Sequence, residues 1–202
     1  MGDKWTLLII RDLASGPRRF VELQRTLPGI STEQLRSRLN RMVADGLLTR
    51  QRYREVPPRV DYELTERSRE LMPVIGALAR WGYDWTWSSP RDGEEINVGA
   101  IFRSGPGLLE ANGANGTAEL VVEGDRGGDR SYVLSVHHAD VSISEVPPED
   151  PDARVRGSVS DWVAALGPDA DTSRLTVTGD QRLADAFVKG FVKAAQAKAH
   201  AA

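Results

Sequence analysis

Hydrophobic residues in the first part of the chain recur at helical spacing and predict three helices. Their inward-facing residues are Trp5, Leu8, Ile9 and Leu13 in the first, Phe20, Leu23 and Leu27 in the second, and Leu35, Leu39 and Met42 in the third. Ser31 and Gln34 form a capping box at the start of the third helix, and Gly46 is placed to end it. This order, with a short helix and a tight turn before the third helix, is the layout of a helix-turn-helix.

Beyond the third helix the pattern changes to alternation. Residues 47–54 and 59–64 predict two strands of a hairpin, and residues 55–58 connect them. Pro57 and Pro58 lie in this connection, where they would stiffen the tip of the hairpin. Thr65 is then expected to cap a long helix that Pro73 bends or restarts near its first turns. The residues expected to face inward on that helix are Leu71, Ile75, Leu78 and Trp81.

The second part of the chain carries a different pattern, after a segment rich in small and helix-breaking residues at 88–93. Strands are predicted at 117–123, 130–137, 140–145 and 153–157 and within 172–180. Ser160 is expected to open a short helix, and Asp180 to cap a final one. We therefore predict an α+β fold with a helix-turn-helix domain at 1–87, a linker at 88–95 and a second domain at 96–202.

Charge divides the chain in the same place. Up to Trp87 there are 15 Lys and Arg against 11 Asp and Glu, whereas the rest has 11 against 18. Residues 18–59 alone carry ten arginines and four acidic residues. Such a basic excess favours a surface that faces phosphate, although a merely solvated charged face has the same composition.

Several classes of function are excluded or disfavoured. The chain has no cysteine, which excludes disulfides, thiolate metal sites and thiol catalysis. No apolar run approaches the ~20 residues of a membrane span, so we expect a cytoplasmic protein without one. His137 and His138 are neighbours on a predicted strand and point to opposite faces, and no HExxH, GxSxG, P-loop or paired-carboxylate arrangement is present. We expect no enzymatic activity, no metal and no cofactor.

Separated motifs in the first part resemble the HxlR family of bacterial winged helix-turn-helix regulators. They are GDKWT, GPRRF, LPGIS, ADGL and PPRVDYELT, in this order, over residues 2 to 87. The resemblance implies a homodimer on an inverted-repeat operator in double-stranded DNA, with the recognition helix at 32–45 and the wing at 50–62. Family members usually have a further dimerising segment before GDKW, in some with a sensing cysteine, whereas here Met1 directly precedes Gly2.

The recognition helix supplies most of the candidate DNA contacts. We expect Gln34, Arg36 and Ser37 to lie nearest the bases, because arginine matches guanine O6 and N7, and glutamine matches adenine N6 and N7. Arg38 and Arg41 are expected at the backbone, and an ion pair between Arg41 and Asp45 is the alternative. The full set of predicted contact residues is Arg18, Arg19, Ser31, Thr32, Gln34, Arg36, Ser37, Arg38, Arg41, Arg52, Arg54 and Arg59.

The second part resembles a sterol carrier protein type two domain. The resemblance rests on DARVRGSVSDWVAALG followed by RLTVTGDQRLADAF, within residues 97 to 195. It implies an α/β domain in which a sheet and helices surround an apolar tunnel for a lipid-like ligand. In some regulators such a domain only contributes packing.

The aromatic run RWGYDWTW leaves two interpretations. Trp81 and Trp85 lie one helical turn apart, and such residues usually pack in a core or between domains. A dimer contact or the mouth of an effector pocket is the other interpretation.

Together these predictions describe a DNA-binding transcription regulator. A small apolar ligand is expected to modulate its binding to the operator. The alternative is a carrier of hydrophobic ligands whose winged helix mediates protein contacts. The operator, the effector, the target genes and the sign of regulation are not specified by the sequence.

Overall fold

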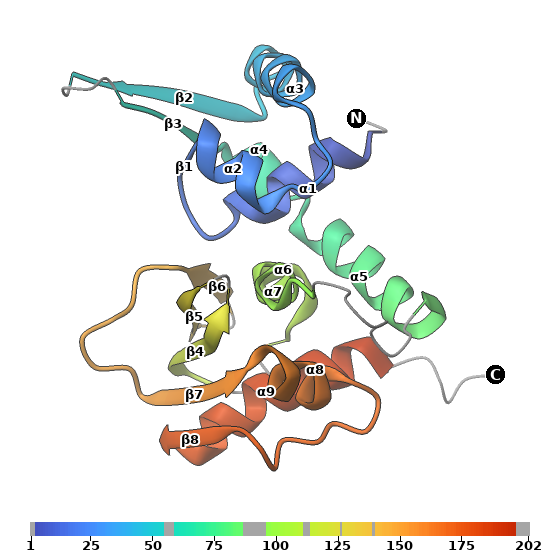
Figure 1. The fold of residues 1–202 in the computed structure, drawn as a ribbon, viewed down its shortest axis with the longest axis vertical. Coiled ribbons are helices and arrows are strands. Elements are labelled where there is room, and N and C mark those ends of the chain that lie inside the picture. The colour runs from blue at the N-terminus through green and yellow to red at the C-terminus, as the bar shows by residue number, and fades with distance from the viewer. Residues whose placement is uncertain are drawn as a thin grey trace.

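In the N-terminal half (residues 3–86), the described residues form a three-stranded sheet and five helices. A computed structural model of the chain describes residues 3–54, 59–86, 96–110, 114–125, 127–138 and 140–196. The elements of this half are α1 (Lys4–Leu13), β1 (Arg18–Arg19), α2 (Phe20–Thr26), α3 (Thr32–Ala44), β2 (Leu48–Tyr53), β3 (Arg59–Leu64), α4 (Glu66–Arg69) and α5 (Met72–Thr86). This is the predicted winged helix-turn-helix, and its hairpin projects away from the helices (Figure 1).

The ends of α3 follow from local chemistry. The Ser31 hydroxyl accepts a hydrogen bond from the backbone N–H of Gln34, and the Gln34 side chain accepts one from the backbone N–H of Ser31, as predicted. At the other end, Gly46 adopts a φ of 70°, which residues with a Cβ adopt only at a cost. Leu35, Leu39 and Met42 face the core, as their spacing predicts.

The wing is an antiparallel pair with Leu48 opposite Leu64 and Tyr53 opposite Arg59. A two-residue strand that the sequence did not indicate, β1, lies on the other side of β3, with Arg18 opposite Tyr62. Arg18 and Arg19 thus pair with the wing strand β3, and α2 starts at Phe20 with Arg19 as its N-cap. The connection at 55–58, which contains the proline pair, lies outside the described residues.

The helix after the wing breaks where Pro73 predicted a break. α4 ends at Arg69, and α5 starts at Met72 with Pro73 in its first turn, where a missing N–H costs no helical hydrogen bond. The predicted inward stripe was wrong at Leu78 and Trp81, whose exposed fractions are 50% and 59%. The inward face of α5 instead follows Met72 and Ile75.

In the C-terminal half (residues 96–196), the part of the chain that the structure describes has four helices against a five-stranded sheet. Its elements are α6 (Val98–Arg103), α7 (Gly105–Leu108), β4 (Gly116–Asp125), β5 (Gly128–His137), β6 (Asp140–Ser144), β7 (Ala153–Ser158), α8 (Val159–Leu166), β8 (Thr176–Gly179) and α9 (Gln181–Gln196). The strand order is β6-β5-β4-β7-β8, in which only the β4–β7 pair is parallel. α8 is capped two residues earlier than predicted, because Ser158 and not Ser160 supplies the capping hydroxyl.

Each half has its own cluster of buried side chains, and α5 contributes to both. Met72 and Ile75 belong to the N-terminal cluster, whereas Ala79 packs against the C-terminal one. α5 and α7 approach so closely that a Cβ on Gly76 would lie 1.7 Å from the carbonyl oxygen of Gly107. The predicted linker at 88–95 lies outside the described residues, and among the described helices none has the length and apolarity to cross a membrane.

Candidate nucleic-acid interface

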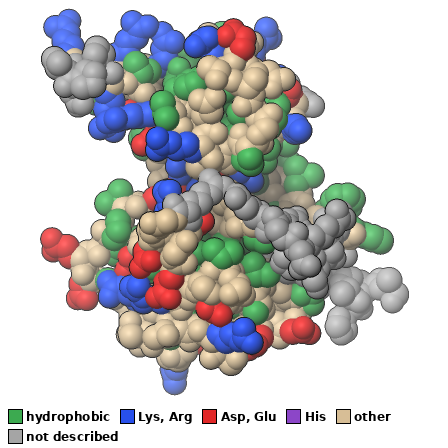
Figure 2. All heavy atoms as spheres, viewed as in Figure 1, with side chains coloured by type: hydrophobic (Ala, Val, Ile, Leu, Met, Phe, Trp, Pro, Cys, Tyr) green, Lys and Arg blue, Asp and Glu red, His purple; other side chains and the backbone are tan. Residues whose placement is uncertain are grey.

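Basic side chains gather on the N-terminal half. Figure 2 shows most of the Lys and Arg side chains over α3 and the wing, whereas most of the Asp and Glu side chains lie on the C-terminal half. The residues that make this basic surface come from α3, β1, β2 and β3, so the fold brings together segments far apart in the sequence.

The side of α3 opposite its buried stripe is polar and open to solvent. The predicted contact residues on that side are exposed, and they are Thr32, Gln34, Arg36, Ser37 and Arg41. Arg38 is only partly exposed, because its guanidinium donates a 2.7 Å hydrogen bond to the Asp3 carboxylate at the start of α1. The spacing of the apolar stripe therefore placed five of these side chains correctly on the solvent face.

Two arginines of α3 make ion pairs at its surface. Arg36 lies 2.7 Å from the Glu33 carboxylate, and Arg41 lies 3.0 Å from that of Asp45, the pair the sequence offered as an alternative. Exposed pairs of this kind contribute only about 0.3–0.5 kcal/mol. A phosphate can therefore replace the carboxylate partner at little cost.

Capping constrains the candidate base-reading residues. The side-chain oxygen of Gln34 accepts the backbone N–H of Ser31, so a bidentate contact with adenine would require this bond to open. Thr32 likewise accepts a 2.7 Å hydrogen bond from the Gln24 side chain. The guanidinium of Arg36 is more available than either side chain, because within the described part of the chain its one ion-pair partner is the exposed Glu33.

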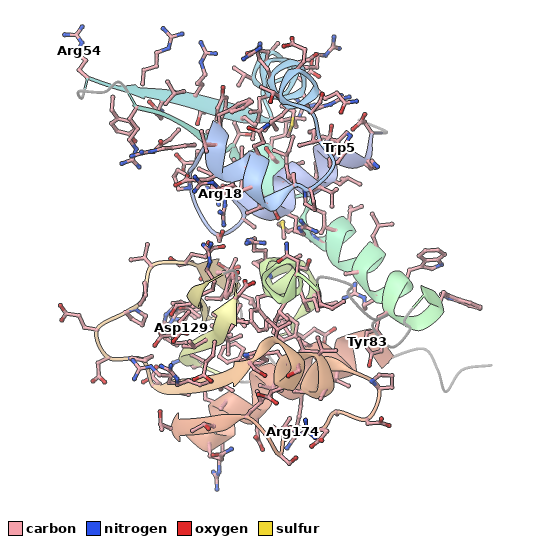
Figure 3. All side chains as sticks on the ribbon, in the orientation of Figure 1. Trp5, Arg18, Arg54, Tyr83, Asp129 and Arg174 are labelled. Carbon is pink, nitrogen blue, oxygen red and sulfur yellow. The ribbon has the colours of Figure 1, made fainter. Side chains whose placement is uncertain are left out.

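β2 presents a row of arginines on one face of the wing. Arg50 and Arg52 alternate along the strand, Arg54 directly follows it, and all three are exposed; Figure 3 shows Arg54 at the outer end of the wing. The sequence prediction omitted Arg50, although its two-residue spacing from Arg52 was the signal that places it on the same face.

The other wing arginines converge on a buried carboxylate. Asp61 is 1% exposed and accepts hydrogen bonds of 2.6–2.9 Å from the Arg59 guanidinium. Arg19 approaches it to 3.9 Å from β1. The Arg59 guanidinium also lies over the Tyr53 ring, 5.3 Å from its centroid. Asp61 thus holds two half-exposed guanidinium groups beside the middle and outer part of the wing, a role that no sequence motif had indicated.

Arg18 does not lie with the other predicted contact residues. Its side chain is 12% exposed and donates to the Asp12 carbonyl oxygen at 2.7 Å and to the Ser15 hydroxyl at 3.0 Å. It also donates to the Glu145 carboxylate in the C-terminal half. Figure 3 shows Arg18 where the two halves meet, away from the tip of the wing. Its guanidinium is therefore occupied by protein groups.

Comparison with known proteins decides the family. The model of the HxlR-like helix-turn-helix matches residues 1–90. An uncharacterized HTH-type transcriptional regulator of Methanothermobacter thermautotrophicus is 37% identical over 95 residues, which cover 47% of this chain and 72% of that protein. The chain belongs to the HxlR family.

Two further matches are similar over the same share of the chain. An uncharacterized HTH-type transcriptional regulator of Synechocystis sp. is 44% identical over 85 residues, which are 42% of this chain and 63% of that protein. The solved structure of the redox regulator HypR in its oxidized form has a TM-score of 0.41 and 34% identity, and covers 43% of this chain and 90% of that chain. Both relatives carry the name of an HTH-type transcriptional regulator, and the family model ends before the C-terminal half begins.

Proposed function

We propose that this HxlR-family chain regulates transcription by binding an inverted-repeat operator as a homodimer. α3 would enter the major groove, and the wing would follow the adjacent phosphate backbone. The observation that carries the proposal is the shared orientation of basic side chains. The exposed side of α3 and the exposed face of β2 both carry arginines that, among the described residues, have no strong intramolecular partner.

The proposed DNA contacts fall into two groups, those to bases and those to phosphates. Arg36 and Ser37 lie in the N-terminal part of α3, the part of a recognition helix that lies deepest in the groove. The row of Arg50, Arg52 and Arg54, together with Arg19 and Arg59 held by Asp61, suits phosphate contacts, which position the protein without specifying sequence.

An exposed apolar stripe on α5 supports the homodimer. Val74, Leu78, Trp81 and Trp85 follow one another at spacings of four, three and four residues, so they share one face of the helix. Their exposed fractions lie between 49% and 76%. Tryptophan and leucine at this density are typical of a surface that another protein covers. Of the two interpretations of the aromatic run, this favours the dimer contact.

We further propose, as the sequence resemblance suggests, that the C-terminal half is a sterol-carrier-like domain, separated from the first by the segment at 88–95, and that an apolar ligand modulates DNA binding. Phe102 packs edge-on against Tyr132 and Trp162 inside this half. A pocket of about 170 Å³ lies beside β7, β8 and α9, with Val155, Leu175 and Val188 among its lining. Pockets for drug-sized ligands measure roughly 300–1,000 Å³, so this one suits a short aliphatic group rather than a whole sterol.

Selection from fragmented genomic DNA followed by footprinting tests the function. We expect one recovered motif, protected at two half-sites whose centres are about 34 Å apart. Arg36→Ala should weaken binding and relax the preference at one base position in each half-site. Arg174→Ala, which removes an exposed arginine of the C-terminal half, is the matched control and should bind as the wild type does.

The outcome also separates the regulator from the carrier. Recovery of no motif, together with equal behaviour of the Arg36→Ala and Arg174→Ala variants, would favour a ligand carrier whose winged helix contacts proteins.

A further inference from the structure

A buried cluster of charged side chains joins the two halves. Arg103, at the end of α6, is 3% exposed, and its Nε donates a 2.9 Å hydrogen bond to Oε1 of Glu145, which follows β6. Its Nη1 lies 3.6 Å from Oδ1 of Asp12, a fully buried residue of α1. The Arg103 guanidinium also lies 5.5 Å from the centroid of the Tyr132 ring. One arginine of the C-terminal half thus faces a carboxylate from each half.

Glu145 in turn reaches into the N-terminal half. Its Oε1 accepts a 3.1 Å hydrogen bond from the Ser15 hydroxyl and another from the Arg18 guanidinium. The same oxygen therefore collects donors from the α1–β1 corner and from α6. These partners are 42, 127 and 130 residues away in the sequence. The contact forms only when both halves are folded against each other.

The charges of the cluster depend on one another. Burial alone would raise the pKa of Glu145, but Arg103 and Arg18 outweigh it and hold that pKa below its ordinary value. Burial likewise opposes the charge of Arg103, yet Asp12 and Glu145 raise its pKa above the ordinary value. Without the Glu145 carboxylate, Arg18 and Arg103 would face each other across a largely dry space.

Arg18 connects this cluster to the DNA-facing surface in short steps. It belongs to β1, where it pairs with Tyr62 of the wing strand β3. The next residue, Arg19, pairs with Asp61 across the same two strands and is also the N-cap of α2. The position of β1 therefore affects both the middle of the wing strand β3 and the start of α2, the helix that leads to α3.

We propose that Glu145, held by Arg103, is a positioning residue for DNA recognition, although it lies in the C-terminal half. It fixes the α1–β1 corner and thereby the orientation of the wing relative to α3. The inference rests on the proposed DNA-binding function. If Glu145 has this role, the C-terminal half helps to position the basic surface of α3 and the wing.

Glu145→Gln tests the proposal, with Glu149→Gln as the matched control. Glu149 is an exposed acid four residues further along, so the control removes the same charge from the same segment. Fluorescence anisotropy with a labelled operator duplex should show about 2- to 30-fold weaker binding for Glu145→Gln, the range for residues that modulate coupling between sites. Glu149→Gln should bind as the wild type does.

Hydrogen exchange supplies a readout that separates positioning from stability. The backbone amides of β1 and β3 should lose protection in Glu145→Gln at temperatures well below its unfolding, while those of β4 and β7 keep theirs. Glu145→Asp, which keeps the charge, should recover part of both effects. Two results would overturn the proposal. One is a Glu145→Gln protein that binds DNA with wild-type affinity, and the other is one that melts at a lower temperature while hydrogen exchange in β1 and β3 stays unchanged.

The proposed function can fail separately from this inference. If the wild type binds no DNA at all, the function is wrong, and the exchange of β1 and β3 still shows whether Glu145 holds the corner. If the wild type binds and Glu145→Gln binds equally well, only the positioning role is wrong.

Discussion

At the scale of single residues, Asp61 is the acidic group on which the proposed interface most depends. A carboxylate on a DNA-binding surface ordinarily repels phosphate. The Asp61 carboxylate is buried, however, and it forms ion pairs with Arg59 and Arg19. We therefore expect its loss to harm DNA binding through the arginines that it orients.

The isosteric change Asp61→Asn should weaken DNA binding by about tenfold, or ~1.4 kcal/mol, although it removes a negative charge. The reason is that Arg59 loses a charge-assisted, bidentate partner, so that its guanidinium is no longer held in one orientation. Asp45→Asn is the control, because Asp45 is a surface partner of Arg41 and its loss should leave binding equal or tighter. Anisotropy titrations measure both, and tighter binding by Asp61→Asn would contradict this role.

The sequence predicted these residues unevenly. The exposed residues of α3 follow from the period of its apolar stripe, and Gly46 and the capping box define its ends. The burial of Arg18 could not be predicted, because its partner Glu145 is 127 residues away. Asp61 likewise became recognisable as an organising group only once β1 had been placed beside β3.

At the scale of elements, α5 packs against the chain with one face and exposes an apolar stripe on the other. One face packs against both halves, and the opposite face carries the apolar stripe. The sequence predicted the helix and its break at Pro73 but assigned the wrong face to Leu78 and Trp81. Periodicity alone cannot say which of two apolar stripes on a helix meets the core of its own chain.

Leu78→Glu should shift the protein from dimer to monomer. The substitution places a charge in the middle of the stripe, where an interface would have to bury it. Val146→Glu is a suitable control, because Val146 is 77% exposed but lies in the C-terminal half, away from the stripe. Sedimentation velocity distinguishes the states. Equal masses for Leu78→Glu and the wild type would exclude the stripe as the dimer contact.

The sequence did not indicate α6 and α7. The Gly105-Pro106-Gly107 run is typical of a turn, yet it forms the start of α7. Gly107 is required there because α7 packs directly on α5, and a Cβ on it would lie 1.8 Å from the carbonyl oxygen of Met72. Gly107 is therefore needed for close packing between two helices. The sequence alone does not distinguish such a glycine from one that forms a turn.

Gly107→Ala should therefore destabilise the fold by about 1–3 kcal/mol, the usual cost of overpacking. Gly128→Ala provides the comparison, because a Cβ there meets open space. Urea unfolding monitored by tryptophan fluorescence should show the loss for Gly107 and a change within about 0.5 kcal/mol for Gly128. A Gly107→Ala protein as stable as the wild type would contradict the close contact of α5 and α7.

At the scale of the whole molecule, the junction should make stability depend on acid pH. The pKa of Glu145 is lowered in the folded protein, against burial, by Arg103 and Arg18. Its contribution is thus complete above the ordinary value of 4.5 and is lost as pH falls below that value toward the lowered pKa.

The melting temperature should consequently fall more steeply between about pH 5 and pH 3 in the wild type than in Glu145→Gln, which has no proton to gain there. Calorimetry at several pH values measures this difference. Parallel profiles for the two proteins would show that the ionised Glu145 does not stabilise the junction. Glu149→Gln, whose acid is exposed, should follow the wild type.

The central claim is that the arginines of α3 and the wing form one phosphate-binding surface, and the salt dependence of DNA binding tests it most directly. A dimer that neutralises ~6–10 phosphates should lose roughly 10³- to 10⁵-fold in affinity between 50 and 200 mM salt. In fluorescence anisotropy with a labelled operator duplex, we predict this steep dependence of affinity on salt for the wild type. The double variant Arg50→Ala, Arg52→Ala should show a shallower dependence. Arg174→Ala should keep the wild-type slope. A flat slope for the wild type would contradict the account.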